Sequence, residues 1–217
     1  MSKLLKDEDR KVITEKYWSK LLDHVSLVYF NSRSKDCEYC EILNDLYMEL
    51  VETSDMLSLK VYYIEEEEEI ASKYRVKKAP AVVLVGRNEG LIKFYGAPAG
   101  MEFPSFLETI VLASRGEAKI SDSLKRKIIN EVVKDINIKV FVTPACPYCP
   151  QMASVACQFA IISSHFDVEV WEALEFPEEV RKYDVMAVPK VIINDIVSFE
   201  GLVSPNDLFR RVKDVLK

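Results

Sequence analysis

The segment Cys146-Pro-Tyr-Cys149 has a counterpart in Cys37-Glu-Tyr-Cys40, and these two Cys-x-x-Cys motifs reveal how the chain is organised. The first cysteines of the two motifs lie 109 positions apart. The same offset relates further pairs of identical residues: Lys73 and Lys182, Tyr74 and Tyr183, Val76 and Val185, Pro80 and Pro189, and Val82 and Val191. Because a constant offset over such a distance is typical of an internal duplication, the sequence indicates two homologous units.

The order of helices and strands is predicted to be the same in both units. In the first unit, the spacing of apolar residues predicts helices over 7–24, 40–53, 66–74 and 104–115, and strands over 25–31, 58–64, 81–85 and 91–95. In the second unit, helices are expected over 123–133 and 150–165, and strands over 138–143, 168–173, 190–194 and 196–199. Each unit therefore alternates strands with helices and closes on a β-hairpin.

This order predicts an α/β fold with two units in tandem, each a mixed four-stranded sheet with helices on both faces. The stretch 115–121 separates the units, which places the first at residues 1–117 and the second at residues 118–217. Two separate sheets are expected, one in each unit, and each unit carries one of the Cys-x-x-Cys motifs.

The composition argues against several classes of protein. The 217 residues include 29 Lys and Arg against 35 Asp and Glu, and no basic cluster that would bind nucleic acid. No run approaches the ~18 apolar residues of a membrane helix, and charges from Lys6 to Lys11 interrupt the apolar core of a secretory signal. We expect a cytoplasmic protein without nucleic-acid or membrane partners. The count of 6 glycines is typical of a thermophile, although drift also produces it.

Each Cys-x-x-Cys motif follows a predicted strand and opens a predicted helix. Unpaired N–H groups and the helix dipole stabilise a thiolate at a helix N-terminus, so Cys37 and Cys146 are the expected nucleophiles. Cys40 and Cys149 are expected to resolve the mixed disulfide that forms. The chemistry is thiol–disulfide exchange, and it needs no cofactor beyond the two redox-active cysteine pairs.

Zinc binding is the alternative, because Cys-x-x-Cys is also half of a four-thiolate site. Three observations argue against a metal. The pairs are separated by 105 residues, each pair lies in its own unit, and each unit has a proline 43 residues after its first cysteine. We therefore predict no metal site.

The two motifs differ in their neighbouring residues. Asp36 and Glu38 flank Cys37, whereas the stretch 143–150 around Cys146 has no charge. Because carboxylates disfavour a nearby thiolate, Cys146 is expected to be the more acidic nucleophile and the first pair the stronger reductant. Proline is tolerated in the first turn of a helix, so Pro147 and Pro150 predict a helix that begins at or just before Cys146.

The second motif, together with Met186-Ala-Val-Pro-Lys-Val-Ile-Ile193, resembles the glutaredoxins. The tandem arrangement over essentially the whole chain resembles the protein disulfide oxidoreductases of thermophilic archaea and bacteria, which contain two thioredoxin-like units. The stretches 98–103, 142–150 and 172–177 are similar to signatures of that family.

The resemblance implies reduction, oxidation and isomerisation of protein disulfides, with a flavin-dependent thioredoxin reductase as the regenerating partner. It also implies that the Ala79-Pro80 and Val188-Pro189 bonds are cis and lie beside the redox pairs, where they contact substrate. Because the glutathione-binding Gly-Gly-x-x-Asp element is missing around Gly201, glutathione is not expected as the reductant.

Four other side chains have two interpretations each. Tyr39 and Tyr148 either shape a substrate groove or pack in the first turn of a helix. Cys157 is expected in the core rather than as a reactive thiol, because it lies among apolar helical positions. Glu172, on a predicted strand, is either a partly buried acid that relays a proton to Cys149 or an exposed carboxylate.

Three functions are consistent with the sequence. The first is an enzyme that exchanges thiols and disulfides on proteins. The second is a dedicated redox carrier that reduces one partner, such as a peroxidase or reductase module. The third is a scaffold held together by zinc.

Overall fold

The computed structural model describes residues 3–217, so residues 1 and 2 of the predicted first unit lie outside the described part. The first helix, α1 (Asp7–Lys16), is followed by a short 3₁₀ helix, Trp18–Lys20, so the single helix expected over 7–24 is shorter and divided. The first half contains α1 (Asp7–Lys16), β1 (Val25–Asn31), α2 (Cys40–Val51), β2 (Leu57–Tyr63), α3 (Glu68–Lys73), β3 (Ala81–Val85), β4 (Leu91–Tyr95) and α4 (Glu102–Arg115).

The second half repeats this order, which confirms the internal duplication. It contains α5 (Asp122–Glu131), β5 (Ile136–Val142), α6 (Cys149–Ile162), β6 (Phe166–Glu172), α7 (Pro177–Lys182), β7 (Lys190–Ile193), β8 (Val197–Glu200) and α8 (Pro205–Leu216). The segment between α4 and α5 includes the predicted unit boundary, whose position stays a prediction. The predicted α/β class with two tandem units is confirmed.

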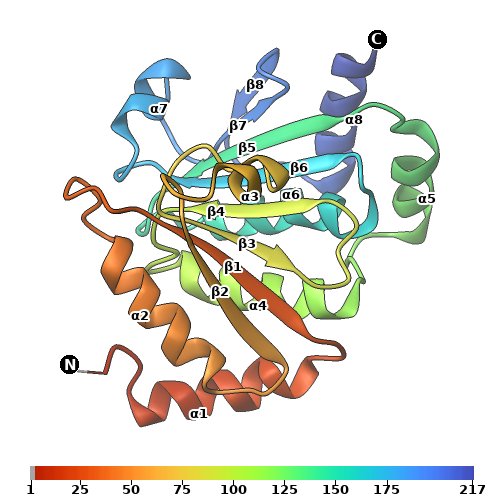
Figure 1. The fold of residues 1–217 in the computed structure, drawn as a ribbon. Helices are drawn as coiled ribbons and strands as arrows, with labels where there is room; N and C mark the ends of the chain where they lie inside the picture. Colours follow the sequence, from red (N-terminus) through yellow and green to blue (C-terminus); the bar gives the residue numbers. More distant parts are fainter. Residues whose placement is uncertain (1–2) are drawn as a thin grey trace.

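All the strands form one continuous sheet in the order β2-β1-β3-β4-β6-β5-β7-β8 (Figure 1). Within each half the sheet is mixed and four-stranded, as predicted. The expectation of two separate sheets is wrong, because β4 pairs in parallel with β6 and joins the halves. Their register sets Ile92 opposite Val168 and Phe94 opposite Val170. Side-chain periodicity predicts a strand but not its partner in another unit, so the sequence could not show this pairing.

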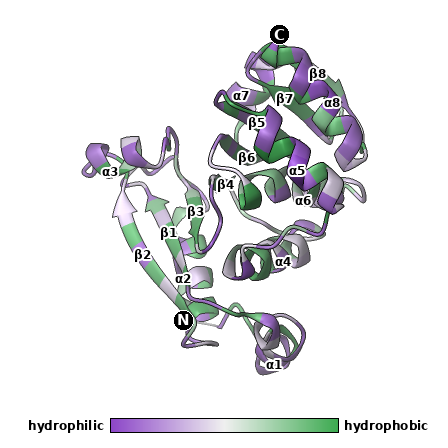
Figure 2. Cartoon of the chain, turned by 90° about the vertical axis from the view of Figure 1, so that its right-hand side faces the viewer, coloured by the Kyte–Doolittle hydropathy of each residue, from purple (hydrophilic) through white to green (hydrophobic). Residues whose placement is uncertain are grey.

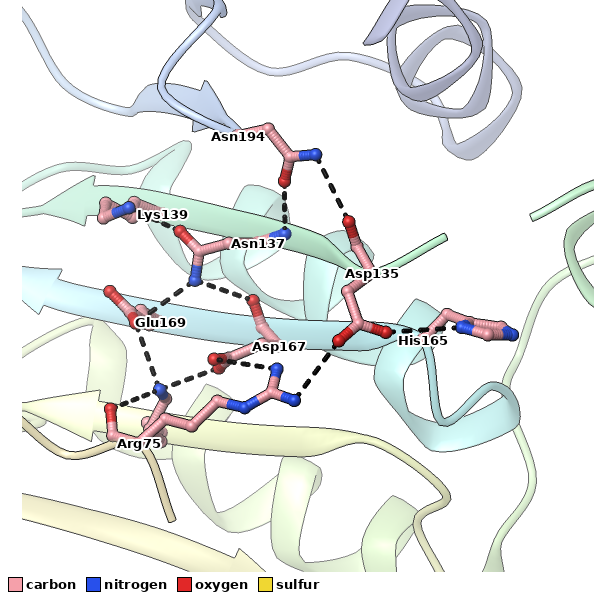
Figure 3. A network of polar contacts seen from close by, with 9 residues as sticks. Arg75, Asp135, Asn137, Lys139, His165, Asp167, Glu169 and Asn194 are labelled. Atoms are coloured by element: carbon pink, nitrogen blue, oxygen red, sulfur yellow. Dashed lines mark hydrogen bonds and ion pairs between the residues drawn. The ribbon is translucent and has the colours of Figure 1, made fainter. Parts of the chain in front are cut away.

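A buried polar network connects the two halves where β4 meets β6. Lys93 in β4 has no exposed surface, and its Nζ lies 2.8 Å from Asp167 Oδ1 and 3.0 Å from Glu169 Oε1 in β6. The same ammonium group donates to the carbonyl oxygen of Arg75 at 3.0 Å. Further ion pairs and hydrogen bonds extend the network to Asp135 and other neighbours (Figure 3). These contacts fix the register of the joining strands.

Helices cover both faces of the sheet, as predicted. On one face α3 and α7 enclose a small core with Phe30, Tyr95 and Trp171, in which the rings of Tyr95 and Trp171 stack with centroids 3.7 Å apart. The larger core on the other face includes residues of α1, α2, α4, α5, α6 and α8. Figure 2 shows hydrophobic and hydrophilic residues alternating along α5 and α8, as expected of helices with one buried face.

Candidate active site

The two cysteine pairs lie at equivalent places, each after a strand and at the start of a helix. Cys37 and Cys40 lie between β1 and α2, and Cys146 and Cys149 lie between β5 and α6. Each pair forms a disulfide with Cα atoms 5.5 Å apart. Cys146 is 7% exposed, whereas Cys37 is only partly buried. The first pair is therefore more open to a client protein.

The helix of the second unit begins at Cys149, with Pro150 in its first turn. The expectation that this helix begins at or just before Cys146 is therefore wrong. Pro147 lies in the turn before the helix, where its missing N–H removes no helical hydrogen bond. The nucleophilic sulfur thus lies just before the helix N-terminus, not within the helix.

Backbone hydrogen bonds differ between the two pairs. The N–H of Cys149 lies 3.1 Å from Cys146 Sγ and points its donor at the sulfur. In the first pair, the N–H of Cys40 donates to the carbonyl oxygen of Cys37 at 3.4 Å, and Tyr29 donates its hydroxyl to the carbonyl oxygen of Cys40 at 2.7 Å. Because a donor at the sulfur stabilises a thiolate, this difference supports the expectation that Cys146 is the more acidic nucleophile.

A cis-proline loop lies beside each redox pair. The Ala79-Pro80 and Val188-Pro189 bonds are both cis, which confirms the expectation from the sequence. Ala79 and Pro80 line a cavity together with Cys37, and the carbonyl oxygen of Val188 lies 3.7 Å from Cys146 Sγ. That these four residues bind substrate stays a prediction.

The cavity beside the first pair has a volume of about 390 Å³. Cys37, Tyr39 and Pro80 of the first unit form part of its lining, and Glu172 and Glu175 of the second unit form another part. The first redox site is therefore built by both units. The sequences of separate units could not show this, because it depends on the pairing of β4 with β6.

Glu172 and Glu175 are held side by side at this cavity. Glu172 is 3% exposed and accepts the N–H of Glu175 at 2.7 Å, and Glu175 accepts the N–H of Ala97 at 2.7 Å. The other oxygen of each carboxyl group is buried without a hydrogen-bond partner. Burial raises the pKa of Glu172, and burial together with the charges of Glu172 and Glu38 raises the pKa of Glu175 to about 7.

Neither of the two sequence-based interpretations of Glu172 describes its position fully. It is buried, so the exposed alternative is wrong, and it lines the cavity at Cys37 rather than one at Cys149. A relay to Cys149 stays a prediction. Glu175 was missed by the sequence analysis, although it lies in the family-like stretch 172–177.

Glu102 is a second buried acid that the sequence did not reveal. It lies in the first turn of α4, is 2% exposed, and has both carboxyl oxygens buried without partners. Burial raises its pKa to about 8. The start of α4 contacts the start of α6, where Ser105 donates its hydroxyl to the carbonyl oxygen of Pro150 at 3.0 Å. Glu102 therefore belongs to the helix that supports the second redox pair.

The remaining candidates fall into two groups. Tyr39 and Tyr148 are 38% and 61% exposed, so neither is a core side chain, and Tyr39 lines the cavity at the first pair. Cys157 has no exposed surface, which confirms its place in the core. Burial, together with the charge of Glu102, raises the pKa of the Cys157 thiol, so this thiol is unsuited to act as a nucleophile.

Two kinds of feature matter for the described part of the chain, a cluster of metal-ligating side chains and a membrane-spanning helix. Within residues 3–217, no group of three or more His, Cys, Asp or Glu side chains is arranged to hold a metal ion. In the same range, none of the helices combines the length and the apolar character that crossing a membrane requires. The cytoplasmic location expected from the sequence stays a prediction.

These features define a class of protein, the thiol–disulfide oxidoreductases with a thioredoxin fold. The thioredoxin domain family matches the chain twice, over residues 29–108 and 136–213. The chain belongs to this family, with two copies of the domain in tandem.

Comparison with other proteins agrees with this assignment. A probable thioredoxin of Methanothermobacter thermautotrophicus is 35% identical over 83 residues, which cover 38% of this chain and 98% of the relative. The alkyl hydroperoxide reductase AhpF of Escherichia coli is 22% identical over 207 residues, which cover 95% of this chain and 37% of the relative.

Two solved structures resemble the whole chain. A protein disulfide oxidoreductase from Aeropyrum pernix has a TM-score of 0.84 and 29% sequence identity, with 97% of this chain and 93% of that one covered. The resemblance inferred from the sequence is thereby confirmed. The alkyl hydroperoxide reductase AhpF from Enterococcus faecalis has a TM-score of 0.85 and 23% identity, covering 95% of this chain and 98% of that one, and shows the same fold.

Proposed function

We propose that the protein is a protein disulfide oxidoreductase that reduces, oxidises and isomerises disulfides of client proteins. The observation that carries this proposal is the duplicated redox site, in which a disulfide at the start of a helix lies beside a cis-proline loop. The name of the similar Aeropyrum pernix structure supports the same activity.

The exchange proceeds through a mixed disulfide. In the reduced protein, the thiolate of Cys37 or Cys146 attacks one sulfur of a client disulfide, and the client sulfur–sulfur bond breaks. The released client thiolate takes up a proton. Cys40 or Cys149 then loses its proton and attacks the mixed disulfide, which frees the second client thiolate and closes the protein disulfide. The second client thiolate also takes up a proton. In total the client gains two electrons and two protons, and the protein loses two electrons and two protons, one of which left when the nucleophilic thiolate formed.

Each part of the site has a role in this exchange. The helix start and its N–H groups stabilise the thiolate, as the contact between the Cys149 N–H and Cys146 Sγ illustrates for one pair. We assign the binding of an extended client segment to the cis-proline loops, whose backbone groups lie beside the sulfurs. Tyr39 and Tyr148 flank the same surfaces and supply exposed aromatic contacts.

The alternative function is a dedicated redox carrier for one partner, such as a peroxidase or reductase module. The similarity to the alkyl hydroperoxide reductase AhpF supports this alternative, because the matched region covers 95% of the chain. In either function we expect a separate reductase to regenerate the dithiols, and a flavin-dependent thioredoxin reductase is our proposed partner.

The test is reduction of insulin by dithiothreitol, with and without the protein. We expect the parent to accelerate the reaction and the double variant Cys37→Ser/Cys146→Ser to give the uncatalysed rate. Equal acceleration by parent and double variant would refute the exchange mechanism. Acceleration with a single cognate partner, and none with insulin, would instead identify a dedicated carrier.

A further inference from the structure

The cavity beside the first redox pair is lined by acidic residues from two parts of the chain. Asp36 and Glu38 flank Cys37 in the first unit, and Glu172 and Glu175 approach from the second unit. Among residues 3–217, the lining contains no Lys, Arg or His that would neutralise them. A client that inserts beside Cys37 therefore meets four carboxyl groups.

Two of these carboxyl groups have an unfilled hydrogen-bond capacity. One oxygen each of Glu172 and Glu175 is committed to a backbone N–H, as described above, and Glu172 Oε1 and Glu175 Oε2 are buried without a partner. Both of these oxygens are buried, and a buried carboxylate without a donor is unfavourable, so a cation in the adjoining cavity stabilises the charged form of each group through the electrostatic attraction. The cavity is thus suited to an ammonium or guanidinium group.

The second redox site has a different surface. The stretch 143–150 around Cys146 has no charged residue, and the charge nearest in sequence to its cis-proline loop is that of Lys190, which follows Pro189 directly. Tyr148 is 61% exposed, and Met186, which precedes Val188, is 83% exposed. The second motif therefore lacks the flanking carboxyl groups that Asp36 and Glu38 provide beside Cys37.

We propose that the first redox site is selective for client disulfides with Lys or Arg next to the attacked cysteine, and that Glu172 and Glu175 provide this selectivity. The proposal rests on the proposed function and adds a class of substrate to it. In an extended client, residues one or two positions from the cysteine lie about 3–7 Å from it along the chain, so a long basic side chain reaches the cavity. The unit that carries the second redox pair thereby determines the clients of the first.

The experiment compares two full-length variants that each retain one redox pair. Cys146→Ser/Cys149→Ser keeps the first pair, and Cys37→Ser/Cys40→Ser keeps the second. Each is assayed for kcat/KM with three disulfide-bonded peptides that differ only in the residues beside one cysteine, which are Lys, Gln or Glu. We expect the first pair to favour the Lys peptide over the Glu peptide by about 5–20-fold at low salt, and less at high salt. The second pair should show less than about a twofold preference under the same conditions.

Two matched variants, made in the chain that keeps the first pair, locate the selectivity. Glu172→Gln/Glu175→Gln replaces both ionisable carboxyl groups by amides, whose oxygens accept the same backbone N–H groups. Glu8→Gln/Glu15→Gln removes two charges from α1, which lies at the other end of α2. We expect the first double variant to lose most of the preference and the second to keep it. The control variant should leave the rates of all three peptides unchanged.

Each outcome bears on one of the two proposals. Equal rates for the Lys and Glu peptides at the first pair would overturn the selectivity and leave the exchange function intact. A uniform slowing of all peptides by Glu172→Gln/Glu175→Gln would also overturn it, because the carboxyl groups would then act on the chemistry or the folding. Absence of exchange by both single-pair variants with every peptide would refute the proposed function itself.

Discussion

Replacement of Lys93 by methionine tests how the two units are held together. The ammonium group of Lys93 lies 2.8 Å from Asp167 and 3.0 Å from Glu169, and all three side chains are buried where β4 meets β6. Methionine is unbranched and of similar length, so Lys93→Met fills the same space without the charge. The variant leaves two buried carboxyl groups without their shared cation.

The size of the effect follows from these distances. At an effective dielectric constant of about 20, each contact near 3 Å contributes on the order of 5 kcal/mol of attraction, most of which offsets the desolvation of the three ions. Removal of one partner from a buried ion pair typically destabilises a protein by about 3–5 kcal/mol. We expect Lys93→Met to lower the free energy of unfolding by about 4 kcal/mol and Tm by about 8–16 °C.

The loss should depend on pH. Burial raises the pKa of Asp167, and the charge of Lys93 opposes that shift. Without Lys93 the pKa of Asp167 rises further, so the folded variant binds a proton that the unfolded chain releases, and its stability falls as the pH rises. The loss should therefore be larger at about pH 8 than at about pH 5.

Guanidinium unfolding followed by circular dichroism measures this loss. Lys60→Met is the matched control, because Lys60 is exposed on the edge strand β2, and it should change the free energy of unfolding by less than about 0.5 kcal/mol. A loss below about 1 kcal/mol for Lys93→Met, or an equal loss at both pH values, would refute the reasoning.

Three further predictions concern the redox sites. A Cβ at Gly100, where φ is +57°, would lie 2.6 Å from the Pro144 carbonyl oxygen, so Gly100→Ala should slow exchange at the second pair. Gly116→Ala is the control, because Gly116 also has a positive φ, of +64°, but lies at the C-terminal end of α4 beside Arg87. Equal rates at the second pair in both variants would contradict this prediction. Burial raises the pKa of Glu102 to about 8, so the folded protein holds a proton there that the unfolded chain releases, and its stability should fall as the pH rises. Relative to Glu102→Gln, the parent should lose up to about 4 kcal/mol of unfolding free energy between about pH 5 and pH 9. Parallel stability profiles of the two proteins over this pH range would refute the prediction. Cys146 should titrate at a lower pH than the nucleophile of the first pair, as measured by thiolate absorbance in variants that keep one pair, and the reverse order would show that the electrostatic argument fails.

Much of the fold was predictable because it depends on local patterns. The strands Val25–Asn31, Ala81–Val85 and Leu91–Tyr95 have the limits that their apolar runs indicate. The cysteine pairs and the two prolines could be found because the same offset of 109 positions relates each of them to its counterpart in the other unit. Local sequence thus identified the groups that carry the redox chemistry.

The surroundings of these groups were not predictable from local sequence. Lys93 and Glu169 are 76 positions apart, and Ala97 and Glu175 are 78 positions apart, so their contacts exist only after β4 has paired with β6. A buried carboxyl group such as Glu102 has the sequence pattern of any acidic residue in the first turn of a helix. Burial of such residues is a property of the assembled molecule.

The continuous sheet also affects the tendency of the protein to aggregate. Two separate units would expose four edge strands, whereas the described chain leaves only β2 and β8 unpaired on one side. β8 has only 4 residues, and β2 carries the exposed Lys60, both of which are known devices against edge-to-edge association. The apolar strand β4, which would otherwise be a template for pairing between molecules, is covered by β6. The joining of the two units in one sheet thus covers one edge strand of each unit, β4 of the first and β6 of the second.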